Sequence, residues 1–492
     1  MLLSLEQIAT FTGAEIIGDP RNASRIACGI SWDSREVEAG FVYVALPGER
    51  VDGHSFVVPS FEAGAVAALI SRDPDETMLR SAHNHNALLL QVPDTHQAFT
   101  DLAKGWRGCL TARVIGLTGS TGKTTTKNLV RDVLSSTYKT VATKANQNNE
   151  LGVPRTLLNA NPDTEMVVVE MGMRGAGQIA HLCTFVKPDW GVITNIGESH
   201  IELLGSRDNI ARAKAELIAG IPDSGVAFLN GADDKTDFVW QSAEGSRRGV
   251  VPVCYDGSGN YGLQDAGCQV AVDAQRVVWA EDITLDEEGY PTFMLCCKGF
   301  LEQVEEQVQV TLALRGLHNV SNACAAAAVG RMANIPLVRI AEALQLSKPE
   351  SARLEVTRAP GGYTVINDAY NANPDSMRAS LNLFAALEVP GKRFAVLGDM
   401  GELGSFAPAM HEEVGAYAAA SSLDWLVCVG ELAVHIAQGA KQAGFPEDKI
   451  VQMRTKEDAL AFVKEHVVSG DAVLVKASHS MELDQVAKGL LN

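Results

Sequence analysis

Residues 116–127 read GLTGSTGKTTTK, and this short stretch decides what kind of fold the chain adopts. The apolar pair Val114-Ile115 precedes it and indicates a short buried strand. After it, apolar residues recur at helical spacing from Leu129 to Leu134. Glycines in such a turn let backbone N–H groups approach an anion, and the start of the helix adds partial positive charge. The stretch therefore predicts an α/β domain with a cradle for phosphate.

Two side chains of this turn favour a nucleotide as the ligand. Lys123 can reach the terminal phosphates, and the Thr124 hydroxyl can bind magnesium. The general phosphate-loop pattern has a glycine five residues before Gly122, where this chain has Leu117. An ordinary glycine turn is the alternative, but Gly-Lys-Thr between a strand and a helix rarely occurs without a phosphate to hold. The predicted nucleotide contacts of the loop are Gly119, Ser120, Thr121, Gly122, Lys123, Thr124 and Thr125.

Bulk properties exclude several classes of protein. A chain of 492 residues is too long for one core and predicts roughly two to four domains. Its 46% hydrophobic and 21% charged residues are typical of soluble globular proteins, and a net charge of −19 argues against a nucleic-acid partner. The nine cysteines are scattered without Cys-x-x-Cys spacing, which indicates reduced thiols. No apolar run reaches membrane-spanning length and the first residues do not resemble a signal peptide, so we expect a cytoplasmic protein.

Three regions differ in pattern, and we predict an α/β protein of three domains. Residues 1–105 hold short strand-like runs between charged turns, typical of a small α/β domain. Residues 106–345 alternate apolar strands with helices, which predicts a mostly parallel sheet covered on both faces. Within that region, residues 250–312 resemble antiparallel strands of a subsidiary sheet. Residues 346–492 contain further β–α units and predict a Rossmann-like domain that lacks the dinucleotide glycine fingerprint.

Polar residues follow two of the predicted central strands. Glu170 ends one apolar strand, and ligands of open α/β sheets bind beyond the carboxyl ends of the strands. A carboxylate there can hold magnesium, and capping of a nearby helix is the alternative. His200 follows the next strand and can act as a base or bind a softer metal, since magnesium prefers oxygen. A loop histidine without such a role is equally compatible with the pattern.

Four further polar positions stand out. Lys214 lies on the apolar stripe of its helix, where a lysine must extend to solvent or serve a function with a shifted pKa. Asn319 starts an alanine-rich helix and can read a base edge or cap the helix. Asp368, after a strand of the third region, can bind a ribose hydroxyl or a cation. Arg353, just past a predicted linker at residues 347–350, can bind phosphate from a different domain.

Together these segments resemble the ATP-dependent Mur ligases of peptidoglycan synthesis over nearly the whole chain. The phosphate loop of that family reads Thr-Gly-x-x-Gly-Lys-Thr, which accounts for Leu117. Residues 148–154, 367–374 and 397–404 are similar to segments of the members that add D-alanyl-D-alanine. The Asp-Asn-Pro-Arg tetrapeptide of members that add the third amino acid is absent from the sequence.

The resemblance implies ATP and two magnesium ions as cofactors. Thr124 and Glu170 would bind one ion, and His200 would help to hold the second. Lys214 matches the lysine that is carbamylated in the family and can then bind magnesium as an anion. Lys123, Lys214 and His200 are accordingly the predicted catalytic residues.

The resemblance also implies the remaining contacts. Asn319 and Asp368 would contact adenine and ribose, and Arg353 the γ-phosphate. Residues 31–35 and 48–56 match the uridine-binding segments of the family. The predicted substrate contacts are Ser34, Arg35, Asp52, Gly53, His54 and Asn149. At position 479 this chain has His where relatives commonly have Arg, so no arginine role is expected there.

The implied activity is a ligation that consumes ATP. Residues 1–105 would bind UDP-N-acetylmuramoyl-tripeptide, residues 106–345 ATP, and residues 346–492 the incoming D-alanyl-D-alanine. ATP would convert the terminal carboxylate of the tripeptide to an acyl phosphate, which the dipeptide amine attacks. A Mur ligase that adds diaminopimelate, lysine or glutamate is one alternative, and an ATP-switched regulator is another. We expect a monomer.

Overall fold

The first of three regions that each carry a main sheet contains residues 3–109. The computed structural model describes residues 1–48, 51–261, 268–300, 304–350 and 352–492. Five strands form one sheet in the order β2-β7-β6-β5-β4, and a two-stranded sheet, β1-β3, lies beside it. The helices and strands are β1 (Leu3–Ser4), α1 (Leu5–Thr12), β2 (Glu15–Ile17), β3 (Ile26–Ala27), β4 (Gly29–Ser31), β5 (Phe41–Val44), α2 (Val57–Glu62), β6 (Ala67–Ile70), α3 (Glu76–Asn84), β7 (Leu88–Gln91) and α4 (Thr95–Cys109).

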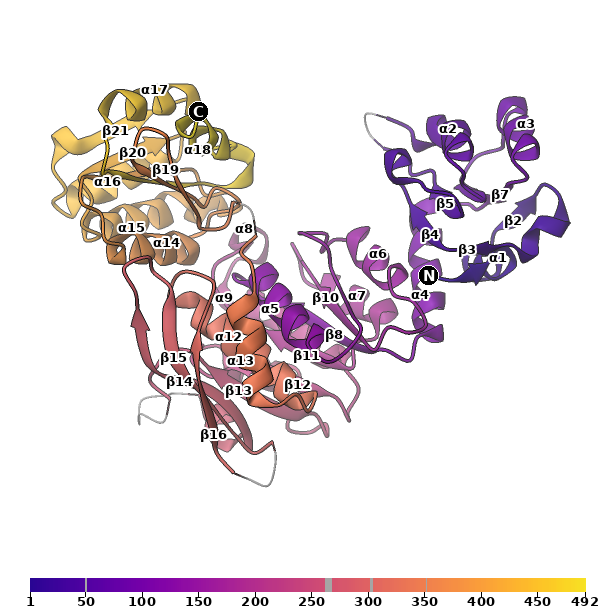
Figure 1. The fold of residues 1–492 in the computed structure, drawn as a ribbon, viewed down its shortest axis with the longest axis horizontal. Coiled ribbons are helices and arrows are strands. Elements are labelled where there is room, and N and C mark those ends of the chain that lie inside the picture. Colours follow the sequence, from indigo (N-terminus) through magenta and orange to yellow (C-terminus); the bar gives the residue numbers. More distant parts are fainter. Residues whose placement is uncertain (49–50, 262–267, 301–303, 351) are drawn as a thin grey trace.

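Helix α4 joins this region to the next, so the expected boundary at residue 105 falls inside a helix. It packs on α1 at one side and on α6 and α7 of the central region at the other. The buried Trp106 donates from its indole nitrogen to the carbonyl of Ala160 at 3.1 Å. Figure 1 shows this N-terminal domain, in indigo, set apart from the C-terminal one, in yellow, with the central domain between them.

The central region is built on a nine-stranded sheet in the order β16-β15-β14-β13-β12-β11-β8-β10-β9. Strands β8 to β14 pair in parallel, and β15 and β16 are antiparallel. Its elements are β8 (Arg113–Thr118), α5 (Lys123–Ser135), β9 (Thr140–Ala142), α6 (Gly152–Leu158), β10 (Met166–Glu170), α7 (Gln178–Val186), β11 (Trp190–Ile193), α8 (Ile201–Leu204), α9 (Arg207–Gly220), β12 (Val226–Asn230), α10 (Thr236–Ser242), β13 (Val251–Asp256), α11 (Gln269–Asp273), β14 (Arg276–Leu285), β15 (Pro291–Lys298), β16 (Glu306–Thr311), α12 (His318–Met332) and α13 (Leu337–Leu346).

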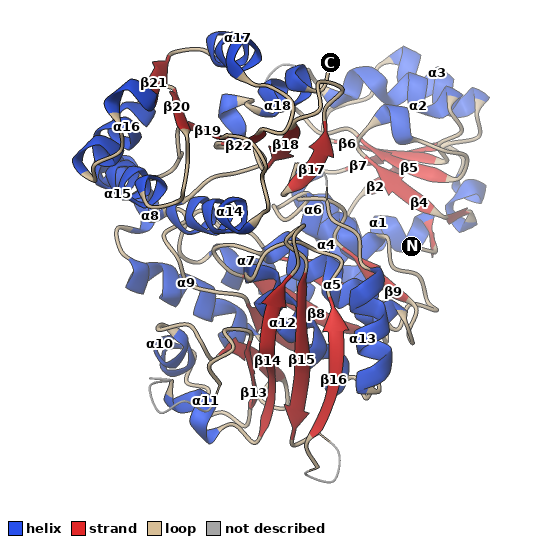
Figure 2. Cartoon of the chain, turned by 60° about the vertical axis from the view of Figure 1, so that its left-hand side comes forward, coloured by secondary structure: helices blue, strands red, loops and turns tan. Residues whose placement is uncertain are grey.

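The antiparallel strands expected within residues 250–312 extend this sheet at one edge. The reason is β13, which pairs in parallel with both β12 and β14 and so leaves no break between the two parts. Figure 2 shows β14, β15 and β16 side by side with helices against the sheet. Residues 262–267 and 301–303 of the expected segment lie outside the described residues.

Two apolar layers hold the central sheet between helices. Helices α5, α12 and α13 cover one face and α6, α7 and α9 the other. Along β8, Val114 belongs to one layer whereas Ile115 and Leu117 belong to the other, as a pleated strand buried on both sides requires. The fully buried alanines at 325–328 let α12 lie close to β12, β13 and β14. The helix packing thereby fixes the start of α5, where the phosphate loop ends.

The C-terminal region has a six-stranded sheet in the order β17-β18-β22-β19-β20-β21, parallel except for the edge strand β17. Helices α14, α15 and α16 lie on one face, and α17 and α18 on the other. Its elements are β17 (Glu355–Arg358), β18 (Thr364–Asn367), α14 (Pro374–Ala386), β19 (Arg393–Gly398), α15 (Ala407–Ala419), β20 (Trp425–Val429), α16 (Ala433–Gln442), β21 (Ile450–Met453), α17 (Lys456–His466), β22 (Ala472–Lys476) and α18 (Asp484–Leu490). The predicted α/β architecture, with a parallel central sheet and a Rossmann-like last part, is confirmed. In the described part of the chain, no helix has both the length and the apolarity to cross a membrane.

Candidate active site

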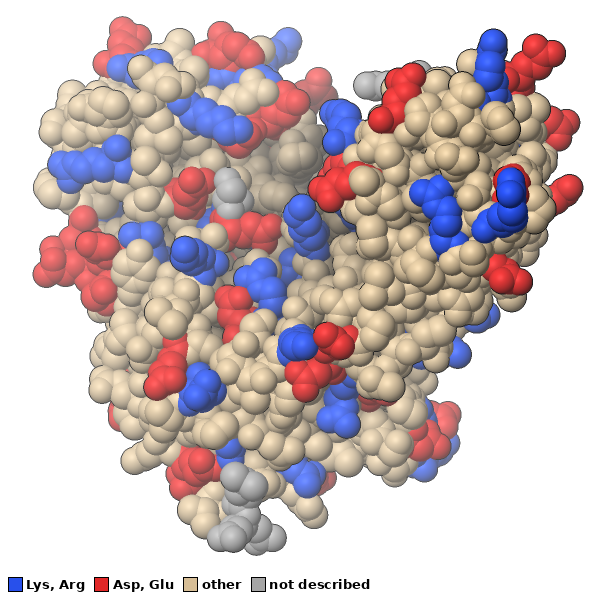
Figure 3. All heavy atoms as spheres, turned by 45° about the vertical axis from the view of Figure 1, so that its right-hand side comes forward, with Lys and Arg blue, Asp and Glu red and all other residues tan. Residues whose placement is uncertain are grey.

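A cavity of about 1350 Å³ lies at the carboxyl ends of β8, β10 and β11 and extends to the C-terminal region. The phosphate loop, the loops that follow β10 and β11, residues 347–350 and the loop after β18 all line it. Figure 3 shows Lys and Arg side chains interspersed with Asp and Glu around the hollow between the two upper lobes of this face. Such a cavity can collect an anionic ligand from several domains.

Glycine is required twice in the phosphate loop. A Cβ at Gly119 would lie 1.8 Å from the Thr194 hydroxyl. Gly122 has φ +73°, and a Cβ there would lie 2.6 Å from Asn322 Oδ1. Lys123 Nζ folds back and donates to the Gly119 carbonyl at 2.8 Å. The loop is therefore an open nest of backbone N–H groups with the Lys123 ammonium beside it, an arrangement that binds phosphate.

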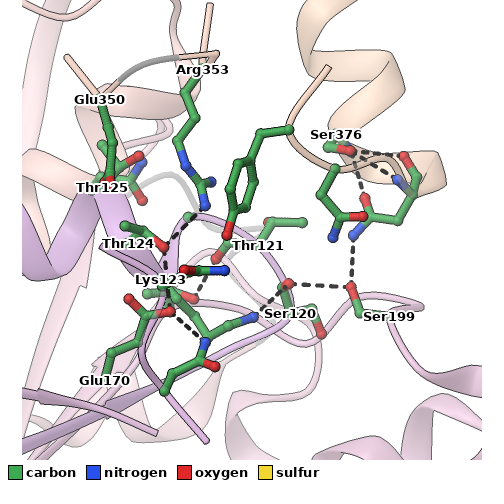
Figure 4. Close-up of a pocket in the computed structure, with 18 of the residues that line it drawn as sticks. Ser120, Thr121, Lys123, Thr124, Thr125, Glu170, Ser199, Glu350, Arg353 and Ser376 are labelled. Atoms are coloured by element: carbon green, nitrogen blue, oxygen red, sulfur yellow. Dashed lines mark hydrogen bonds between the residues drawn. The ribbon is translucent and has the colours of Figure 1, made fainter. Parts of the chain in front are cut away.

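Glu170 and Thr124 meet beside this loop, as Figure 4 shows. The Thr124 hydroxyl donates to Glu170 Oε1 at 3.3 Å, and Asn148 Nδ2 donates to the same oxygen at 2.8 Å. Glu170 is 1% exposed, and its Oε2 has no hydrogen-bond partner among the described residues; Lys127 Nζ is 3.9 Å away. A buried carboxylate oxygen with a free lone pair next to a hydroxyl suits magnesium.

The protein alone does not complete a metal site. Among the residues that the structure describes, no three His, Cys, Asp or Glu side chains gather closely enough to hold a metal. Magnesium commonly takes one or two carboxylates and fills its other positions with water and substrate phosphates. The pair of Thr124 and Glu170 fits that incomplete kind of site.

His200 lines the same cavity from the loop after β11. It is the N-cap of α8, in a left-handed backbone conformation with φ +66°. Its Nδ1 lies 2.6 Å from Oε2 of Glu402, a residue of the C-terminal region. His200 and Glu170 are thus brought to one cavity, as predicted.

Lys214 lies outside the cavity lining, on α9, and is only 1% exposed. Within the described chain its ammonium has neither a hydrogen bond nor an ion pair. Burial lowers the pKa of Lys214 well below its ordinary value, and the charge of Lys123 lowers this pKa further. The neutral amine is therefore favoured, so extension to solvent is not its role here.

Arg353 reaches the phosphate loop from beyond the linker. Its Nη2 donates to the Thr124 hydroxyl at 3.1 Å. Its guanidinium carbon lies 4.1 Å from the centroid of the Tyr370 ring, and that ring packs in turn on His479 with 5.9 Å between centroids. Tyr370 was not among the predicted site residues, although it belongs to the polar segment 367–374 that marked the region.

Asn319 and Asp368 line the cavity, and their polar atoms have partners inside the protein. Asn319 Nδ2 donates to the Arg315 carbonyl at 2.7 Å. Asp368 accepts from Lys476 Nζ at 2.6 Å and from the backbone N–H of Leu354 at 3.1 Å. Through Asp368, these bonds hold Leu354, the residue after Arg353, against the C-terminal sheet.

The predicted uridine contacts of the N-terminal region lie away from this cavity. Arg35 is largely exposed and pairs with Asp33. His54 is buried: its Nδ1 lies 2.7 Å from Asp52 Oδ1, and its Nε2 accepts the backbone N–H of Ser71 at 3.0 Å. Of the predicted residues here, Ser34 and Arg35 lie in the 3₁₀ turn Ser34–Glu36, and Gly53 and His54 in the turn Gly53–Phe56 that Asp52 caps. Residues 49–50 of the second segment lie outside the described residues.

Asn149 belongs to a different part of the molecule from the other predicted substrate residues. It lines the main cavity, and its Oδ1 accepts the backbone N–H of Gly152 at 2.9 Å. This bond holds the turn that leads into α6, next to Asn148 and its contact with Glu170.

Comparison with known proteins settles the family. A model described as "Mur ligase family, catalytic domain" matches residues 28–107, "Mur ligase middle domain" matches 117–330, and "Mur ligase, glutamate ligase domain" matches 352–479. A UDP-N-acetylmuramoyl-tripeptide–D-alanyl-D-alanine ligase of Bacillus subtilis is 37% identical over 475 residues, 96% of this chain and 95% of the relative. The chain belongs to the Mur ligase family. The resemblance drawn from its sequence motifs is confirmed.

Other relatives extend the likeness of this Mur ligase. The Escherichia coli protein of the same name is 32% identical, covering 99% of this chain and 98% of its own. A crystal structure of MurF from Acinetobacter baumannii has a TM-score of 0.81 at 29% identity, covering 100% of this chain and 99% of that one. MurF of Thermotoga maritima, solved in complex with ADP, has a TM-score of 0.72 at 26% identity and covers 94% and 96% of the two chains.

Proposed function

We propose that this Mur ligase joins D-alanyl-D-alanine to UDP-N-acetylmuramoyl-tripeptide and converts ATP to ADP and phosphate. The product would be the UDP-muramoyl-pentapeptide precursor of peptidoglycan. The relatives named for this reaction match nearly the whole chain. The observation that carries the proposal is the buried pair of Thr124 and Glu170 beside the phosphate loop, with Arg353 reaching it from another domain.

The chemistry needs activation of an unreactive acid. The terminal carboxylate of the tripeptide attacks the γ-phosphorus of ATP, and ADP leaves with the bridging oxygen. The amine of the dipeptide then attacks the acyl carbon, loses a proton, and phosphate departs with the electron pair of the C–O bond. Position and neutralised charge supply most of the rate in such a transfer.

Each proposed role of a side chain has a contact in its favour. Lys123 and the loop amides would hold the β- and γ-phosphates, and Arg353 would pair with the γ-phosphate. Thr124 and Glu170 would hold one magnesium ion, and His200 would help to hold a second. When bound, magnesium neutralises phosphate charge and polarises the transferred group.

Lys214 is suited to carbamylation, because only the neutral amine adds to carbon dioxide and its burial favours that form. The nitrogen forms a bond to the carbon of carbon dioxide and releases a proton, which leaves an anionic carbamate. The anion would lie near Lys123 and near the proposed second ion. This would also remove the cost of an unpaired buried amine.

The three regions would divide the substrates between them. Residues 1–105 would bind the UDP-linked substrate, 106–345 ATP, and 346–492 the dipeptide. Asn319 and Asp368 line the cavity where adenine and ribose would lie, and Asn149 lines it from the central region. One chain supplies every residue of this arrangement, so we propose a monomer, and its nucleotide-linked substrates favour the cytoplasm.

The test is phosphate release with UDP-N-acetylmuramoyl-tripeptide and one acceptor at a time: D-alanyl-D-alanine, L-lysine, diaminopimelate or L-glutamate. We expect release with the dipeptide only, and its loss in Lys123→Ala. Release with a free amino acid instead would assign a different member of the family. Release that needs neither substrate would favour the ATP-switched regulator.

A further inference from the structure

Glu402 faces His200 across the boundary between the central and C-terminal regions. The carboxylate oxygen Oε2 lies 2.6 Å from Nδ1 of the imidazole. A backbone bond joins the same two loops, since the N–H of Glu202 donates to the Glu402 carbonyl at 3.2 Å. Both residues line the cavity. The contact is therefore part of the site and not a distant surface pair.

Hydrogen bonds tie the loop that carries Glu402 to its own domain. Asp399 Oδ1 accepts the N–H of Ala433 at 2.7 Å, Met400 donates its N–H to His411 Nε2 at 2.9 Å, and Gly401 donates to Ser478 Oγ at 2.7 Å. These bonds give the segment 397–404 a structural role that the reaction scheme above leaves open.

Both facing residues have an unusual backbone. Glu402 has φ +62° and His200 has φ +66°, a left-handed conformation that is uncommon for residues other than Gly, although Asn, Asp and His adopt it more often than the rest. Such strain persists where the surrounding structure imposes it, and it gathers at functional sites. Here it turns the two side chains toward each other.

A carboxylate beside one imidazole nitrogen settles the state of the other. The two atoms are as close as an ion pair, although the geometry at Nδ1 falls short of a hydrogen bond. An ionised carboxylate can only accept a proton contact, so this short approach favours the ring form that carries its proton on Nδ1. Nε2 then keeps its lone pair, which is the form of imidazole that binds a cation. A carboxylate behind a metal-binding histidine also fixes the plane of its ring.

We propose that Glu402 is a positioning residue for His200, holding the proton on Nδ1 and leaving Nε2 as the cation-binding nitrogen. The inference rests on the proposed metal role of His200. Because Glu402 belongs to the domain beyond the linker, His200 is set for the cation only when that domain is in place. The approach of the C-terminal domain to the central one would therefore also complete the cation site at His200.

The experiment compares Glu402→Gln, His200→Ala, the double variant and Glu431→Gln in the full-length protein. Glu431 is an exposed carboxylate of the same domain, so its variant removes the same charge without touching the cavity. The probe is Mn²⁺ added with a non-hydrolysable ATP analogue, and the free Mn²⁺ is measured by electron paramagnetic resonance. Thermal unfolding of each variant verifies the fold.

We expect Glu402→Gln to weaken binding of one Mn²⁺ by about 10- to 100-fold, with Glu431→Gln unchanged. The double variant should bind no more weakly than His200→Ala, because Glu402 acts through the histidine. Normal binding by Glu402→Gln together with weak binding by His200→Ala would overturn this inference and leave the proposed function intact. Normal binding by His200→Ala would overturn the metal role of that residue and this inference with it.

A second readout needs no metal. In ¹⁵N-histidine-labelled protein, the signal lost in His200→Ala identifies that residue. We expect it to report the Nδ1-protonated ring in the wild type and a mixture of tautomers in Glu402→Gln. An unchanged tautomer in the variant would contradict the assignment, and a purely structural role for Glu402 would not alter this signal.

Discussion

Arg353 donates a hydrogen bond to the hydroxyl of Thr124, 3.1 Å away, although 229 positions separate the two residues in the sequence. The same hydroxyl donates to Glu170. A cation of the last domain thus lies at the phosphate loop, held on the ring of Tyr370. The ring is a rigid platform for a flexible side chain, so the arginine has less freedom to lose when a phosphate arrives.

The platform can be tested at Tyr370. Tyr370→Leu removes the aromatic face, and we expect kcat/KM for ATP to fall by about 2- to 30-fold, the range of a cation–π contact. Tyr370→Phe keeps the face and should stay near the wild type. The measurement is steady-state ADP formation with the ATP concentration varied and with UDP-N-acetylmuramoyl-tripeptide and D-alanyl-D-alanine both saturating. Equal losses in the two variants would mean that the hydroxyl matters and the ring face does not.

Lys214→Met should stabilise the protein while abolishing phosphate release. Burial lowers the pKa of the Lys214 amine in the folded state but not in the unfolded state, so the unfolded state holds the proton more tightly. The folded state thus binds fewer protons, and the wild type gains stability as the pH rises towards the unfolded pKa of about 10.4. Methionine carries no proton, so its burial does not lower the stability of the fold in this way.

The advantage of Lys214→Met should therefore shrink as the pH rises from the lowered folded pKa of the lysine towards its unfolded pKa, by at most about 1.4 kcal/mol for each pH unit. Urea unfolding in bicarbonate-free buffer at pH 7, 8 and 9 measures it. A variant that is less stable than the wild type at pH 7 would show that the lysine has a partner in solution.

The buried pair of Lys476 and Asp368 gives a third prediction. Lys476→Met leaves a nearly buried carboxylate without its cation, and we expect a loss of about 3–5 kcal/mol in the unfolding free energy. Adding Asp368→Asn should restore part of it, because no isolated charge remains. Unfolding by urea, followed by circular dichroism, compares the two variants. A double variant that is less stable than Lys476→Met would contradict this reasoning.

In the N-terminal region, His54 and Arg35 should behave differently. His54→Leu leaves the Ser71 N–H without its acceptor and removes one contact of Asp52, which keeps Arg72, and we expect a loss of about 1–3 kcal/mol in stability. Arg35 is 87% exposed, so Arg35→Ala should change stability by less than about 0.5 kcal/mol. Its effect should instead be weaker binding of UDP-N-acetylmuramoyl-tripeptide, measured by calorimetry. Wild-type affinity in Arg35→Ala would remove that residue from the proposed substrate site.

Local patterns were sufficient for the part of the site that lies on one sheet. A strand, a glycine turn and a helix identify the phosphate loop, and the apolar run before Glu170 places this carboxylate at the same edge. The apolar stripe of α9 likewise indicated that Lys214 faces the core. Each of these inferences uses residues within one or two neighbouring elements.

Contacts between domains could not be predicted from such local sequence patterns. Glu402 and His200 lie on loops of different domains, and no periodicity encodes which loops of two separate sheets will face each other. The hydrogen bond of Arg353 to Thr124 depends on the same relative arrangement. Similarly, an apolar run predicts that β13 is a buried strand, but the run does not state whether its neighbours are parallel.

The pairing of β8 with β10 has a consequence for how this site can change. Glu170 lies opposite Leu117 in that ladder, and each strand contributes its last residues to the cavity. Inserting or deleting one residue in β10 before Glu170 would turn the carboxylate to the opposite face of the sheet, into the apolar layer behind it. Single substitutions can adjust such a centre, and loops of variable length can diversify what it accepts. The strands themselves can vary in composition but not in length.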